Sequence, residues 1–228
     1  MSTEASTISP DDRFAAQLRG FGPAGIVAIV AVLLGNALFI PFSAILALVW
    51  VRVSRTPWGE IGYVRPASWP MTITTGVAFG IAFKFLMKAL VMPLLGAPAV
   101  NQAYHYLAGN RALIPYAIFA MTVGAGFGEE TVFRGYLFER FGKLLGAGTG
   151  ARIAIILTTS LWFGAAHYSM QGMPGMEQAT IVGLVFGALM NREGRLWMLM
   201  VAHAAFDLTA YAMIYWNVEP AVTHLLFR

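Results

Sequence analysis

Long apolar stretches separated by short polar breaks dominate the chain. Six of these stretches are candidate spans, and four of them reach the roughly 20 residues that a helix needs to cross a bilayer. They cover residues 23–51, 71–95, 112–145, 152–168, 178–190 and 196–215. Pro41 interrupts the first stretch and predicts either one tilted, kinked helix or a broken, re-entrant pair. The pattern predicts an all-α, polytopic membrane helix bundle of about six to eight transmembrane helices.

Composition agrees with this interpretation. Hydrophobic residues make up 58% of the chain and charged residues only 11%, whereas about a quarter of the residues in a soluble domain are charged. We therefore expect a multi-pass integral membrane protein in contact with lipid, in a bacterial inner (plasma) membrane. One helical domain covers residues 23–216, with a motif core at about 112–215. A polar tail precedes it at 1–22 and another follows at 217–228.

The charges exclude some classes of function. The net charge of +4 is scattered, without the basic, aromatic-rich patch typical of nucleic-acid binding. The chain has no cysteine, which excludes disulfides, thiol catalysis and cysteine-bound metal. The distribution of Lys and Arg, with Arg134 and Arg140 counted as loop residues, predicts that the loops after the first, third and fifth stretches face the cytoplasm. Lys84 and Lys88, inside the second stretch, are expected to snorkel or to lie near a helix end.

Six polar side chains lie in apolar stretches where an ionisable group is costly and is therefore a functional hypothesis. These residues are Glu129, Glu130, Arg134, His167, His203 and Asp207. Glu130 and Arg134 are four residues apart, which predicts an ion pair on one helix face. At the helical period, Glu129 is then rotated by about 100° and can point elsewhere. His203 and Asp207 share a face for the same reason.

Water activation is the chemistry that uses these side chains. A carboxylate can take a proton from water, and histidines can hold that water or a metal that polarises it. Two histidines and a glutamate also form a ligand set for catalytic zinc, here Glu129, His167 and His203. Nucleophilic serine chemistry fits less well, because neither Ser160 nor Ser169 lies in a nucleophile motif. A purely structural role could explain the polar side chains of any one stretch. It explains less easily why three stretches all carry them.

Three motifs in order resemble those of the CPBP (CAAX protease and bacteriocin-processing, or Abi) family of intramembrane metalloproteases, which includes the type II CAAX prenyl endopeptidases. They are Glu129-Glu130-x-x-x-Arg134, Phe163-x-x-x-His167 and His203-x-x-x-Asp207. The resemblance implies an intramembrane catalytic cavity.

By that resemblance, Glu129 activates the water with the help of His167 and His203, and Glu130 and Arg134 support the helix. The last motif residue, commonly Asn in the prenyl proteases, would stabilise the oxyanion. Here it is Asp207, which donates a hydrogen bond only when it is protonated.

The sequence therefore predicts a peptidase that cleaves a peptide or protein substrate at the membrane. Two alternatives stay open at this stage. One is a non-catalytic scaffold or immunity protein that keeps the polar network for structure. The other is a small ion transporter, which needs a continuous polar path across the bundle. Substrate, cleavage site and oligomeric state are not determined by the sequence.

Overall fold

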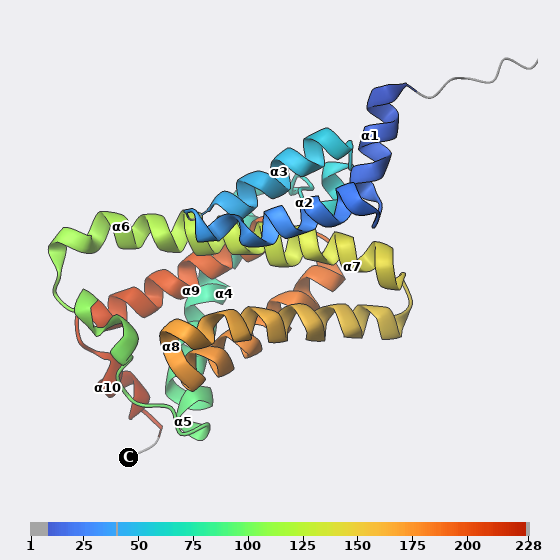
Figure 1. The fold of residues 1–228 in the computed structure, drawn as a ribbon. Helices are drawn as coiled ribbons and strands as arrows, with labels where there is room; N and C mark the ends of the chain where they lie inside the picture. Colours follow the sequence, from blue (N-terminus) through green and yellow to red (C-terminus); the bar gives the residue numbers. More distant parts are fainter. Residues whose placement is uncertain (1–8, 40, 227–228) are drawn as a thin grey trace, which may run out of the picture.

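The described residues, 9–39 and 41–226 of a computed structural model, form helices and turns without a strand (Figure 1). The elements are α1 (Pro10–Arg19), α2 (Pro23–Leu34), η1 (Gly35–Ala37), α3 (Phe42–Ser54), η2 (Trp58–Ile61), α4 (Trp69–Leu86), η3 (Met87–Val91), α5 (Met92–Leu94), η4 (Gln102–Leu107), η5 (Arg111–Leu113), α6 (Ile114–Phe119), η6 (Ala120–Tyr136), α7 (Leu137–Leu145), α8 (Thr149–Glu193), α9 (Trp197–Tyr215) and α10 (Glu219–Thr223). The all-α prediction is confirmed.

The first apolar stretch is split into a pair of helices. Helix α2 ends at the short turn η1, and α3 starts directly after Pro41. Two hydrogen bonds of 2.9 Å close the turn, because the side chains of Asn36 and Ser43 each accept from the other's backbone N–H. The two helices pack against each other (Figure 1). Proline thus breaks this stretch, as one of the two sequence alternatives predicted.

The predicted N-terminal tail contains a docked helix. Helix α1 packs on α3 and makes an angle of 59° with the α2–η1 segment. The Trp50 indole donates to the Leu18 carbonyl over 3.1 Å, and the Arg19 side chain donates to the Ser54 carbonyl. This end of the chain is therefore tied to the bundle.

Helix α8 is a hairpin of two antiparallel arms. A break at Gly172, with φ 63° and ψ −161°, divides it just before Pro174. A Cβ on Gly183 would lie 2.9 Å from Ser160, and one on Gly164 would lie 1.9 Å from the Thr180 hydroxyl. Ser160 meets Gly183 and Gly164 meets Thr180, so the two arms run antiparallel. They correspond to the predicted fourth and fifth spans. The loop expected between these spans is only the turn at glycine, which tolerates positive φ.

The number of crossings depends on how these breaks are counted. Four helical runs of the described residues are long and apolar enough to cross a membrane, or five if the bent N-terminal pair is one span. That count treats α8 as one run; if each of its two arms crosses the membrane, the number of crossings rises by one. The chain is a multi-pass membrane protein, and the exact number of crossings stays a prediction.

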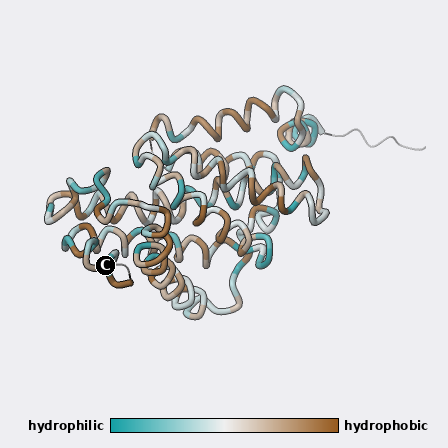
Figure 2. The backbone as a smooth tube through the Cα atoms, turned by 90° about the horizontal axis from the view of Figure 1, so that it is seen from below, coloured by the Kyte–Doolittle hydropathy of each residue, from teal (hydrophilic) through white to brown (hydrophobic). Residues whose placement is uncertain are grey.

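The outer faces of the helices suit contact with lipid. Figure 2 shows hydrophobic residues along most of the helices, with hydrophilic residues gathered mainly near their ends. Large apolar side chains stand exposed, among them Val27, Leu38 and Met71 at 66% or more. An apolar surface of this extent is typical of a membrane protein.

Helix α9 lies between α4 and η6, and glycines let both neighbours approach closely. A Cβ on Gly80 would lie 2.2 Å from the Ala202 carbonyl oxygen. A Cβ on Gly126 would lie 2.8 Å from the carbonyl oxygen of Met200. This contact brings the glutamates of η6 beside the histidine of α9.

The two lysines of the second span are buried and do not snorkel, whereas Lys84 does lie in the last turn of α4, as the other alternative predicted. Lys84 and Lys88 are only 6% and 8% exposed. The Lys88 ammonium lies 2.8 Å from the carboxylate of Glu219, which also accepts from the Asn101 backbone N–H. Lys84 donates to the Gln178 side chain over 3.0 Å. The C-terminal segment supplies the counter-charge, which the sequence pattern of a single span does not reveal.

Two arginines assigned to cytoplasmic loops from the sequence are buried as well. Arg134 is 1% exposed and Arg140 is 3% exposed. Arg140 pairs with Glu139 and donates to the Arg19 carbonyl over 2.8 Å. These two arginines should therefore not be counted as loop charges. The orientation across the membrane stays a prediction.

Replacing Glu219 by glutamine is expected to lower the free energy of unfolding by roughly 3–5 kcal/mol, because it leaves the Lys88 ammonium buried without a counter-charge. Thermal unfolding of the purified protein in detergent measures the change. The control is Glu193→Gln, because Glu193 pairs with Arg192 at the exposed surface and such pairs contribute about 1 kcal/mol or less. Equal stability of the two variants would contradict the role given to the buried pair.

Candidate active site

The first glutamate motif lies on a wide helical turn. Element η6 is a π-helix, in which backbone hydrogen bonds join residues five apart, and it contains both glutamates and Arg134. Helical segments of this kind are rare and often occur at functional sites. The sequence pattern predicted an ordinary helix here. The four-residue spacing nevertheless keeps Glu130 and Arg134 on one face.

The predicted ion pair between Glu130 and Arg134 is present. The Arg134 guanidinium lies 3.0 Å from Glu130 Oε1, and both side chains are buried. The same guanidinium stacks over the rings of Phe163 and Phe186, at 4.6 and 5.7 Å from their centroids. The pair therefore fixes η6 against α8 in the bundle interior.

Glu130 has a second partner that the sequence analysis missed. His203 Nδ1 lies 2.7 Å from Glu130 Oε1. A carboxylate oxygen accepts, so Nδ1 carries a proton, and Nε2 is the nitrogen left for another partner. Glu130 thus orients His203 in addition to bracing its own helix. Spacing within one span could not show this contact, because it joins residues from two elements.

The other nitrogen of His203 faces two carboxylates. His203 Nε2 lies 3.7 Å from Glu129 Oε2 and 3.8 Å from Asp207 Oδ2. Glu129 Oε2 is buried and has no hydrogen-bond partner among the described residues. A carboxylate oxygen left in this state beside an imidazole is suited to hold a small polar ligand such as water.

His167 reaches the same place from α8. Its Nδ1 lies 2.7 Å from the Phe163 carbonyl oxygen, which can only accept, so Nδ1 carries a proton and Nε2 is left for another partner. The Phe163 ring touches both imidazoles, with centroids 4.6 Å from His167 and 6.0 Å from His203. The fold brings Glu129 and Asp207 within 4 Å of His203 Nε2, and the Phe163 ring connects His167 to this group; the roles of all four residues stay predictions.

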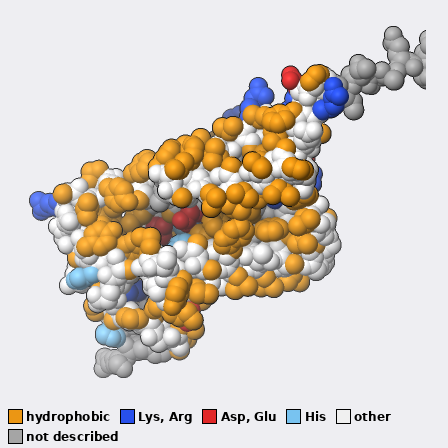
Figure 3. All heavy atoms as spheres, in the orientation of Figure 1, with side chains coloured by type: hydrophobic (Ala, Val, Ile, Leu, Met, Phe, Trp, Pro, Cys, Tyr) orange, Lys and Arg blue, Asp and Glu red, His pale blue; other side chains and the backbone are white. Residues whose placement is uncertain are grey.

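The site opens to the outside on one side. The side chains of Glu129 and Asp207 are 27% and 29% exposed, whereas that of His203 is 5% exposed. Figure 3 shows acidic side chains beside a histidine in a hollow of a largely apolar face. A substrate can therefore approach the carboxylates while the histidine is held from behind.

The donor types suit zinc, but the donors do not assemble. Two imidazoles whose Nδ1 atoms are held by acceptors, together with a carboxylate, are typical of a catalytic zinc site. No group of three or more such side chains is arranged to hold a metal ion in the part of the chain that the structure describes. The predicted zinc set of Glu129, His167 and His203 stays a hypothesis.

A tyrosine in the polar loop after α3 supports the back of η6. The Tyr63 hydroxyl lies 2.7 Å from the Thr131 hydroxyl, next to the glutamates. Burial raises the pKa of Tyr63 to about 12, so its hydroxyl stays protonated at neutral pH. This contact fixes the loop before α4 against the motif.

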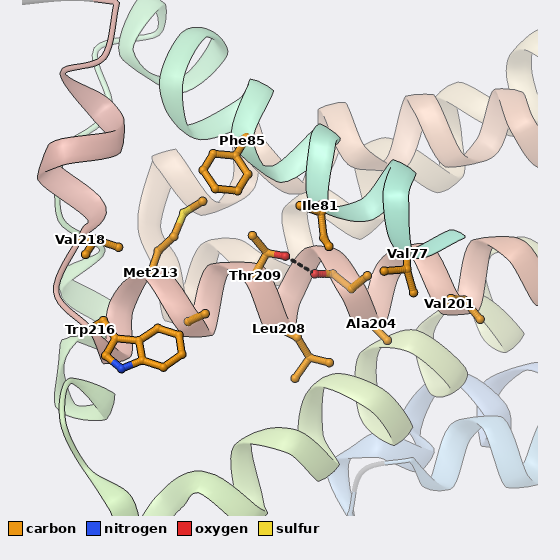
Figure 4. A pocket seen from close by; sticks show the side chains of 12 residues that line it. Val77, Ile81, Phe85, Val201, Ala204, Leu208, Thr209, Met213, Trp216 and Val218 are labelled. Carbon is orange, nitrogen blue, oxygen red and sulfur yellow. Dashed lines mark hydrogen bonds between the residues drawn. The ribbon is translucent and has the colours of Figure 1, made fainter. Parts of the chain in front are cut away.

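A separate apolar groove of about 650 Å³ lies between α4 and α9 (Figure 4). Thr209 is the polar side chain in its lining, and that hydroxyl already donates to the Ala205 carbonyl over 2.6 Å. None of the ionisable site residues lines the groove. It is therefore distinct from the site described above.

Comparison with known proteins agrees with the motifs. Residues 111–209 match the family model of Type II CAAX prenyl endopeptidase Rce1-like proteins. All six motif residues fall inside this range. No curated protein and no solved structure matches the chain. The resemblance drawn from the sequence is confirmed at the level of this family domain.

Proposed function

We propose that this chain, which contains a Type II CAAX prenyl endopeptidase Rce1-like domain at residues 111–209, is an intramembrane peptidase that uses water activated by Glu129. The observation that supports this most strongly is the 3.7 Å separation of Glu129 Oε2 and His203 Nε2. These atoms belong to an open hollow in an otherwise apolar bundle. The substrate is a peptide segment presented at the membrane.

One water molecule can contact both atoms. A water oxygen can lie about 2.8 Å from both Glu129 Oε2 and His203 Nε2, because these two atoms are close enough to share it. The water donates a hydrogen to Glu129 and contacts His203 Nε2, so that a lone pair of the water faces the substrate carbonyl carbon. Glu129 takes the proton as the new C–O bond forms. It then gives that proton to the amine as the C–N bond breaks.

The neighbouring groups hold and assist this pair. Glu130 holds the His203 ring by its Nδ1, so that Nε2 faces the water. His167 presents a second Nε2 from α8. Asp207, when protonated, donates a hydrogen bond to the carbonyl oxygen on which negative charge develops.

A library experiment tests the activity. The purified protein in detergent is mixed with a peptide library that includes prenylated and unmodified sequences, and products are identified by mass spectrometry. We expect cleavage by the wild type and none by Glu129→Ala. A library left uncut by the wild type, or cut equally by both proteins, contradicts the proposal.

Chelation tests the zinc hypothesis separately. Because Glu129 and His203 can hold one water between them without a metal, we expect cleavage to survive dialysis against 1,10-phenanthroline. The measurement is the initial rate on the best library peptide before and after dialysis. Loss of the rate, with recovery on addition of zinc, would show that Glu129, His167 and His203 close around a metal.

A further inference from the structure

A tyrosine outside the matched domain lies at one end of the candidate site. Tyr104, on η4, accepts a hydrogen bond of 3.2 Å from the Gln171 side chain. Gln171 is one helical turn after His167 on α8, so both side chains project from the same face. The contact therefore places the Tyr104 hydroxyl one turn beyond the histidine.

The opposite side of Tyr104 meets α9. Its ring packs against a buried cluster that includes Tyr211 and Ile214. Tyr211 is one helical turn after Asp207, on the same face of α9. Element η4 thus closes the space between α8 and α9, next to the open side of the site.

The hydroxyl of Tyr104 is in a state to donate. Burial is the main cause that raises the pKa of Tyr104 to about 12, and the charges of Asp207 and Glu129 add to it. The group is therefore protonated at neutral pH and within electrostatic range of both carboxylates. Its oxygen accepts from Gln171, while no acceptor for its own proton is present among the described residues.

We propose that Tyr104, positioned by Gln171, is a substrate-binding residue whose hydroxyl donates a hydrogen bond to a backbone carbonyl of an extended peptide beside the scissile bond. This inference rests on the proposed peptidase function. The contact lies one helical turn along α8 beyond His167 and does not involve Glu129. It therefore contributes to substrate affinity more than to the chemical step.

Tyr104→Phe removes the hydroxyl and keeps the ring. We expect KM for the best library peptide to rise about tenfold, as for loss of one well-placed hydrogen bond, with kcat within about twofold. The matched control is Tyr106→Phe, because Tyr106 is 58% exposed on the same element, and it should leave KM unchanged. Thermal unfolding should be the same for both variants.

A binding measurement separates this inference from the peptidase proposal. The same two changes are made in Glu129→Gln, and the affinity for the fluorescently labelled peptide is measured by anisotropy. We expect only Tyr104→Phe to weaken binding, again by about tenfold. Unchanged affinity and KM in Tyr104→Phe overturn the inference alone. Full cleavage by Glu129→Gln overturns the proposed function, and this inference with it.

Discussion

Glu129→Gln is expected to lower the rate of peptide cleavage by about 10²- to 10⁴-fold, the range of a lost general base. The amide has nearly the same shape as the carboxylate but cannot take a proton from water. The initial rate with saturating peptide, compared with that of the wild type, measures the effect.

The fold should not suffer from this change. Glu129 Oε2 has no hydrogen-bond partner among the described residues, so the amide breaks no bond at that atom. We expect thermal unfolding at or above the wild-type temperature, as is common when a strained functional group is removed. A scaffold or immunity protein, in contrast, should keep its function with glutamine at this position. Wild-type cleavage by the variant would exclude Glu129 as the base.

Glu130→Gln is expected to have the opposite balance of effects. It leaves the Arg134 guanidinium buried without its counter-charge, which costs roughly 3–5 kcal/mol of unfolding free energy. It also weakens the acceptor that holds His203 Nδ1, so cleavage should fall as well. Reversible unfolding in mixed micelles measures the stability change.

An exposed pair provides the control for Glu130→Gln. Glu60 lies 2.9 Å from Lys143, with both side chains more than a third exposed. Glu60→Gln should change the unfolding free energy by less than about 1 kcal/mol. If Glu130→Gln is as stable as this control, the ion pair does not brace η6. The adjacent glutamates should thus give different phenotypes, as expected if they do not share one proton.

The local parts of the site could be predicted from the sequence. Four-residue spacings placed Glu130 with Arg134 and His203 with Asp207, because a helical turn brings such residues onto one face. The cost of ionisable groups in lipid identified these residues as candidates. Pro41 indicated that the first stretch breaks.

Contacts between distant elements could not be predicted in this way. The hydrogen bond from His203 to Glu130 depends on how closely α9 approaches η6, which Gly126 permits. The buried Lys88 finds its counter-charge in Glu219, far along the chain. Tyr104 was placed in a loop, and Gln171 was assigned to a break between spans, so neither gave a signal. Tertiary packing determines all three.

The fate of solvent oxygen tests the central claim most directly. The wild type and Glu129→Gln are incubated with the best library peptide in water enriched in ¹⁸O, and the masses of the products are measured by mass spectrometry. Hydrolysis by water held at Glu129 predicts one ¹⁸O atom in the new carboxyl terminus of the wild-type product, with almost no product from the variant. Product without the label, or labelled product formed equally fast by Glu129→Gln, would contradict the account.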